Sequence, residues 1–179
     1  VEVFAIVLHI IVKLRKSHPE AVPAYEAEVE SVAHMRKVLL ALPYEDLGTG
    51  DVDLYQIFAW RALDLTRDEG RFGVVFPRSL LNSAGTASWR ERALQSCSFD
   101  VTVLVNAARW AFDMEPRYTI ALVALHKTQP SEGVVSISGP FHSLGDYMAG
   151  HEEAGLLPID NITAATTGAT FPMLPSTAS

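Results

Sequence analysis

The chain has 179 residues, which suits a single domain, and its formal net charge is −7 at pH 7. A protein that binds nucleic acid by itself usually carries a basic face, so this charge argues against DNA binding by the chain alone. The single cysteine, Cys97, excludes an internal disulfide and a thiolate metal cluster, and it fits a reducing cytoplasm.

The chain opens with an apolar run, VEVFAIVLHIIV, over residues 1–12. A membrane-spanning helix needs about 20 apolar residues, so this run is too short to cross a bilayer. It also lacks the basic start and the small-residue cleavage site of a signal peptide. We predict a buried helix or strand here, followed by a polar break over residues 13–18. A chain that opens on Val1 is also expected to have lost its true start.

A helix is predicted over about residues 24–42, and Pro43 ends it. Its apolar side chains recur at helical spacing, at Tyr25, Val29, Val32, Met35 or Arg36, and Leu39. With the first run, this helix forms a helical lead-in over residues 1–50.

The next helix is predicted to begin at Asp53, whose carboxylate is placed to cap the first turn. Gln56 follows three residues later and completes a pair that resembles a capping box. One apolar stripe is expected to face the core, and its members are Leu54, Ile57, Phe58, Ala62 and Leu65. Gly70 stands where a helix commonly ends in the left-handed conformation.

The run over residues 71–76 is almost uniformly apolar and lies between Gly70 and Pro77. Such a run is typical of a central parallel strand that is covered on both faces. After a loop, Ser88 and Glu91 form a capping box that predicts a short helix ending near Ser96.

Two further strands are predicted over residues 99–106 and 118–125. The loop between them is too short for a parallel crossover, so we expect an antiparallel pair. Beyond Lys127 the patterns weaken: a short strand over 134–137, a helical turn or two within 141–155, and a linker or frayed tail over 162–179.

The sequence contains no glycine-rich dinucleotide motif, no Walker loop and no G-x-S-x-G motif. None of the six histidines lies at metal-ligand spacing from Cys, Asp or Glu, so no metal site is predicted. Composition and spacing alone therefore indicate an α/β domain without a particular activity.

Several segments, taken in order, carry a family resemblance. The first of them, GTGDVDLYQIFAWRAL, resembles a motif V segment. The next, GRFGVVFPRSLL, resembles the strand and loop that follow motif V. Residues 107–117 lie where family members carry the aromatic residue of motif VIII. SISGPFHSL and FPMLPS resemble exit segments. This order resembles the adenine-N6 DNA methyltransferases of bacterial restriction–modification and phage-defence systems, closest to the type in which methylase and restriction functions are fused. The resemblance covers residues 44–127 well and the rest loosely.

The resemblance implies a class I, Rossmann-like sheet that uses S-adenosylmethionine and ends in an antiparallel strand pair. The family's cofactor glycine motif and its Asn/Asp-Pro-Pro-aromatic tetrapeptide normally precede motif V, and both are absent here. The chain is therefore expected to hold a partial sheet. Residues 1–50 are the helical lead-in, 51–130 the second half of a catalytic domain, and 131–179 an exit segment towards a target-recognition region.

On the cofactor side, the resemblance matches Phe58 to the aromatic that lies against the cofactor adenine. Asp53 and Tyr55 are further candidates. The alternatives stay open: Phe58 can equally belong to the helix core, and Asp53 can be a cap.

On the DNA side, the resemblance matches Phe112 to the aromatic that stacks on the flipped adenine, with Trp110 as the substitute. Either aromatic could instead plug its own hairpin. Pro77 is a candidate beside the base or a simple strand terminator. Arg78, Arg109 and Arg117 are candidates for DNA phosphates or ordinary surface arginines.

The implied activity of the complete parent enzyme is transfer of a methyl group from S-adenosylmethionine to adenine N6 in DNA. The isolated chain is expected to be inactive and to need a missing N-terminal half or self-association. It is expected to be cytoplasmic, without a metal and without membrane contact. Two alternatives remain: a non-catalytic remnant or interaction module with this architecture, and a class I methyltransferase that acts on RNA or protein.

Overall fold

The computed structural model describes residues 2–45, 47, 52–130 and 132–172, with side chains from residue 9 onward. Contacts divide the chain into two units, residues 1–42 and residues 43–179. None of the described helices is long and apolar enough to cross a membrane.

The first unit contains helices α1, Glu2–Ser17, and α2, Ala21–Leu40. Helix α1 continues through the predicted polar break, because Pro19 is the first residue that stops it. The side chains of Ile10, Ile11 and Val12 are 50%, 43% and 46% exposed, so the prediction of a buried segment is wrong for this part of the run. Helix α2, which matches its prediction, has no buried residue.

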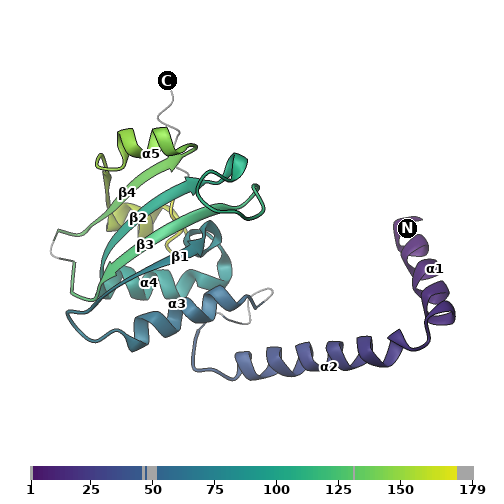
Figure 1. Ribbon diagram of the computed structural model, residues 1–179. Helices are drawn as coiled ribbons and strands as arrows, with labels where there is room; N and C mark the ends of the chain where they lie inside the picture. The colour runs from purple at the N-terminus through teal and green to yellow at the C-terminus, as the bar shows by residue number, and fades with distance from the viewer. Residues whose placement is uncertain (1, 46, 48–51, 131, 173–179) are drawn as a thin grey trace. The chain divides into compact units, whose positions relative to one another are not determined.

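The second unit is a mixed α/β domain built on a five-stranded sheet (Figure 1). Its main elements are α3 Leu54–Leu65, β1 Arg71–Pro77, α4 Ala87–Ser96, β2 Ser98–Val105, β3 Thr119–His126, β4 Val134–Phe141, α5 Leu144–Gly150, β5 Gly155–Pro158 and α6 Ile159–Ala165. Single 3-10 turns lie at η1 Arg78–Leu81, η2 Ala84–Thr86 and η3 Ala107–Arg109.

The strand order is β1-β3-β2-β4-β5. Strands β2 and β3 pair antiparallel from Ser98 opposite His126 to Val105 opposite Thr119, which confirms the predicted pair. Strand β1 pairs antiparallel with β3, β2 runs parallel to β4, and β5 is antiparallel to β4. The sheet is therefore mixed rather than wholly parallel.

Strand β1 lies at one end of this order, so its predicted interior position is wrong for this chain. It is not covered on both faces either. Phe72, Val74 and Phe76 are half-buried or buried, whereas Gly73 and Val75 are exposed. A run that is apolar at every position is suited to two covered faces, but it cannot reveal whether the covering elements belong to the same chain.

Residues 134–141 and 155–158 belong to the sheet. Ile162, Ala169 and Phe171 are buried, so the prediction of a linker or frayed tail is wrong for residues 162–172. Strand β4 extends to Phe141 and pairs with β2, and β5 pairs with β4. The chain then passes through α6 and returns to the core, where the Phe171 amide donates to the Leu81 carbonyl at 2.9 Å. Residues 173–179, which include most of the FPMLPS segment, lie outside the described residues.

Helix α3 uses a different face from the one predicted. Its buried residues are Gln56, Ala59, Trp60 and Leu63, whereas Leu54, Phe58 and Leu65 are 50%, 62% and 70% exposed. The helix is apolar on most sides, so its spacing alone could not select the face that packs.

Both predicted capping pairs are wrong. Asp53 occupies the N-cap position, but its carboxylate makes no capping hydrogen bond. Gln56 is buried, and its Oε1 has no hydrogen-bond partner within the described residues. Helix α4 begins at Ala87 with Thr86 as the N-cap residue, two residues earlier than a Ser88 cap requires.

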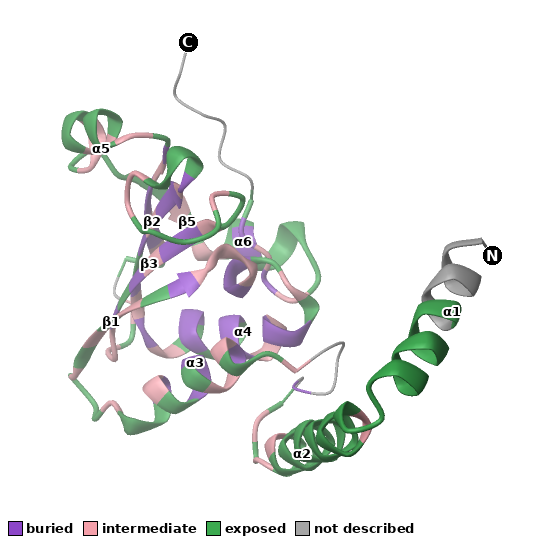
Figure 2. Cartoon of the chain, turned by 45° about the vertical axis from the view of Figure 1, so that its right-hand side comes forward, coloured by how far each residue is buried: buried purple, intermediate pink, exposed green. Residues whose placement is uncertain are grey.

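The core lies between the sheet and helices α3 and α4, on the face below the strands in Figure 1. Trp89 of α4 packs edge-on against Phe76 and Phe99, with ring centroids 6.5 and 6.1 Å apart. Phe171 packs on Phe99 at 5.5 Å. Figure 2 shows this buried layer and, on the opposite side of the sheet, the exposed helix α5.

The face opposite α3 and α4 is only partly covered. Tyr147 of α5 packs near Leu104, Ile120 and Phe141. Further along the same face an open groove is lined by residues of β1, β2 and β3, among them Gly73, Val75, Asp100, Thr102, Leu122 and Ala124. The second unit thus has one covered face and one largely open face.

Candidate functional site

Three strands end at the same edge of the sheet. Strands β2 and β4 are parallel, and β1 and β2 are both antiparallel to β3, so β1, β2 and β4 run in one direction. In open α/β sheets, ligands bind outside the carboxyl ends of such strands. The segments that follow these strands are therefore the first place to look for a site.

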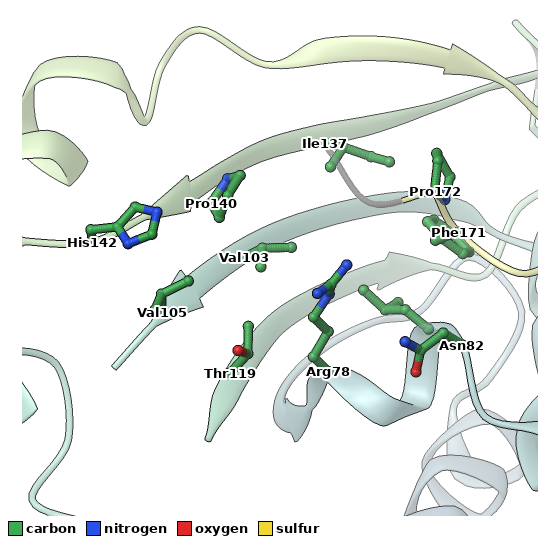
Figure 3. A pocket seen from close by; sticks show the side chains of 11 residues that line it. Arg78, Asn82, Val103, Val105, Thr119, Ile137, Pro140, His142, Phe171 and Pro172 are labelled. Atoms are coloured by element: carbon green, nitrogen blue, oxygen red, sulfur yellow. The ribbon is translucent and has the colours of Figure 1, made fainter. Parts of the chain in front are cut away.

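A cavity of about 260 Å³ lies at this edge (Figure 3). Its polar lining residues are Arg78, Asn82, Thr119 and His142, and the others are Leu81, Val103, Val105, Ile137, Pro140, Phe171 and Pro172. Small-molecule sites usually measure roughly 300–1,000 Å³, so this cavity suits one ring system better than a whole nucleoside cofactor. Figure 3 shows Arg78 between Thr119 and Asn82.

Arg90 links two segments whose neighbouring residues line this cavity. Its side chain is 1% exposed. Nη1 donates to the Leu80 and Ser83 carbonyls at 3.0 and 2.8 Å, and Nε donates to the Gly168 and Ala169 carbonyls at 3.0 Å each. One guanidinium therefore holds the segment after β1 and the segment before Phe171 at a fixed separation.

A second buried polar residue, Asn106, organises the hairpin loop between β2 and β3. Its side chain is fully buried. Nδ2 donates to the Phe112 carbonyl at 2.8 Å, and Oδ1 accepts from the Ala111 and Phe112 amides at 3.2 and 3.1 Å. Within this loop, Ala108 and Arg109 each have φ 59°, a strained conformation for residues with a side chain.

Sequence reasoning missed Arg90, Asn106, Asn82 and His142. A polar side chain at the end of a predicted strand was a usable signal for Asn106, because Asn often bonds to turn backbone. Arg90 stands next to Trp89 on the buried side of α4, and no motif distinguishes it from the exposed Arg92.

The two loop aromatics have different environments. The Trp110 indole Nε1 donates to the Val105 carbonyl at 2.8 Å, and the ring packs near Leu104, Ile120 and Phe141. Trp110 therefore packs against the strands of its own hairpin. Phe112 is 36% exposed, and the bonds of Asn106 fix its backbone.

The candidate DNA-backbone arginines lie around the same edge. Arg78 lines the cavity directly after Pro77, the last residue of β1. Arg109 and Arg117 are exposed in the hairpin loop, and each pairs with an acid, Arg109 with Asp113 at 3.3 Å and Arg117 with Glu115 at 3.0 Å. These exposed pairs are weak, so both arginines are available to stronger anions.

The candidate cofactor residues Asp53, Tyr55 and Phe58 lie at the start of α3. Phe58 is exposed, so the helix-core alternative is wrong and an aromatic face is available. The Tyr55 hydroxyl contacts the Ser83 Oγ at 3.2 Å and is already engaged. None of the three lines the cavity at the carboxyl edge or the groove on the open face.

The described residues contain no group of three or more His, Cys, Asp or Glu side chains that could hold a metal ion. Cys97 is buried, and this burial raises the pKa of its thiol above the ordinary value of 9.0. The thiol is therefore protonated near neutral pH and is a poor nucleophile.

Comparison with known proteins finds one family likeness. No curated protein matches the chain. Residues 27–110, from within α2 to the turn after β2, match the Eco57I restriction-modification methylase family. A methylase family of restriction–modification systems implies S-adenosylmethionine as the methyl donor and DNA as the substrate. This likeness concerns residues 27–110, which span less than half of the chain.

Proposed function

We propose that the chain is the second half of the catalytic domain of a site-specific DNA methyltransferase that modifies adenine N6. The match of residues 27–110 to a restriction-modification methylase family carries this proposal. The exposed Phe112, in the loop that follows the carboxyl end of β2, supports the choice of an extrahelical base as substrate. A cytoplasmic location follows from a DNA substrate.

Two observations support the proposal that the chain holds only part of a catalytic domain: two family motifs are absent, and one edge and one face of the sheet are uncovered among the described residues. The glycine motif and the Asn/Asp-Pro-Pro-aromatic tetrapeptide are absent from the sequence. Strand β1 lies at the end of the sheet, and Val75 on its open face is 53% exposed. A preceding half-domain would add a strand to this edge and cover this face, which removes an aggregation-prone edge.

Within that domain we assign residues 51–130 to the catalytic half and residues 1–50 to the helical lead-in. Residues 131–172 extend the sheet before the chain continues towards a target-recognition region. The boundaries at residues 50 and 130 are those expected from the sequence. The segment after residue 130 contains the paired strands β4 and β5 in place of the expected linker.

In the complete enzyme, this chain's residues would bind and orient the target nucleotide. Extrusion of a paired adenine costs a few kcal/mol, and stacking on an aromatic face returns roughly 1–3 kcal/mol. We assign this stacking to Phe112, while Trp110 holds the hairpin in place. Arg78, Arg109 and Arg117 would meet phosphates, and Pro77 would border the base.

S-adenosylmethionine supplies the methyl group when it is bound. Phe58 would offer its ring to the cofactor adenine, with Asp53 and Tyr55 nearby on the same helix. Because these residues form only one wall, the 179-residue chain should bind the cofactor weakly or not at all. Titration calorimetry tests this expectation, and binding at low micromolar concentration would contradict the partial-domain proposal.

A non-catalytic interaction module is the second candidate. The net charge of −7 and the missing motifs favour it for the isolated chain. The coding sequence upstream of Val1 separates the two candidates. A glycine-rich motif followed by Asn-Pro-Pro-aromatic in the same reading frame supports the enzyme, whereas a frame that lacks both supports the module.

A further inference from the structure

Helix α2 presents a largely apolar seam whose members are exposed or half-buried among the described residues. Its members follow one another at intervals of three and four residues, and they are Val22, Tyr25, Val29, Val32, Arg36 and Leu39. This alternation of three and four is the a/d pattern of a coiled coil. Tyr25, Val29 and Val32 are 66%, 49% and 55% exposed.

We propose that α2 docks antiparallel on α2 of a second copy of this chain. The seam is complementary to itself in one antiparallel register. In that register Val22 faces Leu39 of the second copy, Tyr25 faces Arg36 of the second copy, and Val29 faces Val32 of the second copy. Each a position meets a d position along all six layers, so no residue of the seam is left without a facing residue.

The charge distribution of α2 selects the antiparallel direction. Its first half carries Glu26, Glu28 and Glu30, and its second half carries Arg36 and Lys37. A parallel pair would place the acids beside one another and the two Arg36 side chains face to face in the core. An antiparallel pair places each acidic half beside a basic half, and a polar residue at a single a position is known to set orientation and register.

The Tyr25 layer adds a specific contact. Arg36 would lie over the Tyr25 ring of the second copy, which permits a cation–π interaction. Glu28 of the second copy lies three residues further along the facing helix, or about 4.5 Å along its axis. The Arg36 guanidinium can reach this carboxylate while its methylene stem covers apolar surface.

A second copy suits the seam better than an unrelated partner, because both the apolar layers and the charges match themselves. Helix α2 has 20 residues, which is fewer than three full heptads. A pair of this length gains modest stability, so the association should be weak and should depend on protein concentration. This surface shares no residue with the cavity at the carboxyl edge and does not depend on the proposed methyltransferase activity.

Cross-linking of the 179-residue chain tests both the contact and its direction. The double variant Val22→Cys/Leu39→Cys, treated with a short bis-maleimide, should give covalent dimers. Either single variant should give none, because identical positions lie about 25 Å apart along the axis of an antiparallel pair. Cys97 is buried and does not compete.

Three cross-linking results would overturn the proposal. Covalent dimers of a single variant indicate a parallel pair. No covalent dimer in the double variant indicates that another segment or another protein covers the seam. The wild-type chain could also form dimers in solution although the double variant gives no covalent dimer. That result indicates association through a different surface, such as the edge of β1.

Sedimentation equilibrium gives an independent check of the seam. Val29→Glu places two carboxylates in the central layers and should raise the dimer dissociation constant at least about tenfold. Arg36→Glu should weaken the dimer, and Lys37→Glu is the matched control because it makes the same charge change outside the seam. Equal effects of Arg36→Glu and Lys37→Glu would show that only net charge matters and would refute the proposed register.

Discussion

Removal of the Arg90 guanidinium should be among the most destabilising single changes in the second unit. Its nitrogens donate hydrogen bonds to the carbonyls of Leu80, Ser83, Gly168 and Ala169 and to the hydroxyl of Thr86, all within 3.0 Å. A buried acceptor left without a donor costs about 1–3 kcal/mol. Some of these acceptors will find water or shift, so the costs do not simply add.

We therefore expect Arg90→Ala to lower the free energy of unfolding by about 3–5 kcal/mol, the range found when a buried charged network loses one member. Folded domains are stable by only about 5–15 kcal/mol. The loss corresponds to a fall in Tm of roughly 10 °C or more for a unit of this size. Arg90→Lys should lose less, because it keeps the charge but cannot donate through a planar fork.

Urea unfolding followed by tryptophan fluorescence measures this loss, because Trp89 neighbours Arg90 on α4 and is fully buried. Arg92→Ala is the matched control. Arg92 is exposed on the same helix, and its removal should change stability by less than about 0.5 kcal/mol. A loss below about 1 kcal/mol for Arg90→Ala would refute the view that this guanidinium holds the two segments beside the cavity together.

Three further changes test the loop and the buried thiol. Phe112→Ala should cost the complete enzyme roughly 1–3 kcal/mol in flipped-base binding and turnover with little change in Tm; an unchanged rate with a lowered Tm would mean that the ring only packs under its hairpin. Asn106→Ala should lower the free energy of unfolding by about 2–3 kcal/mol in chemical denaturation, because two amides and a carbonyl lose their partner, whereas Asp113→Ala in the same loop should be nearly neutral. Because burial raises the pKa of Cys97 in the folded state, the folded chain holds this proton more tightly than the unfolded chain does, and stability should fall as pH rises above 9.0. Native Cys97 should also resist a thiol reagent that labels it quickly in denaturant, and rapid native labelling would contradict its burial.

The sequence was informative where local geometry alone decides the structure. The length of the loop between β2 and β3 required an antiparallel pair, and this pair is confirmed. The spacing of Tyr25, Val29 and Val32 predicted α2 correctly because helical periodicity needs no tertiary context.

Prediction failed where the outcome depends on what packs against an element. Strand β1 is apolar at nearly every position, yet only the side with Phe76 is covered within the described residues. Helix α3 has two apolar faces, and the face with Trp60 and Leu63 is buried whereas the face with Phe58 is exposed. The threonine- and alanine-rich composition after residue 162 suggested a tail, but the Arg90 contacts to Gly168 and Ala169 fix that segment.

For the candidate site, too, the sequence predicted local features but not those that depend on tertiary packing. A resemblance in motif order indicated the hairpin aromatics, and only the structure distinguished the bonded indole of Trp110 from the more accessible ring of Phe112. The cavity required side chains from η1, β2, β3, β4 and the segment at Phe171. No local pattern could bring these together, because the pairing of β2 with β4 spans more than thirty residues of sequence.

Mass spectrometry of DNA nucleosides tests the central claim most directly. DNA would be incubated with S-adenosylmethionine and the protein expressed from the whole reading frame that contains this chain, in parallel with the 179-residue chain alone. We expect N6-methyldeoxyadenosine from the complete protein and none from the chain alone. Methylated cytosine, no methylated base from the complete protein, or N6-methyldeoxyadenosine from the chain alone would contradict the account.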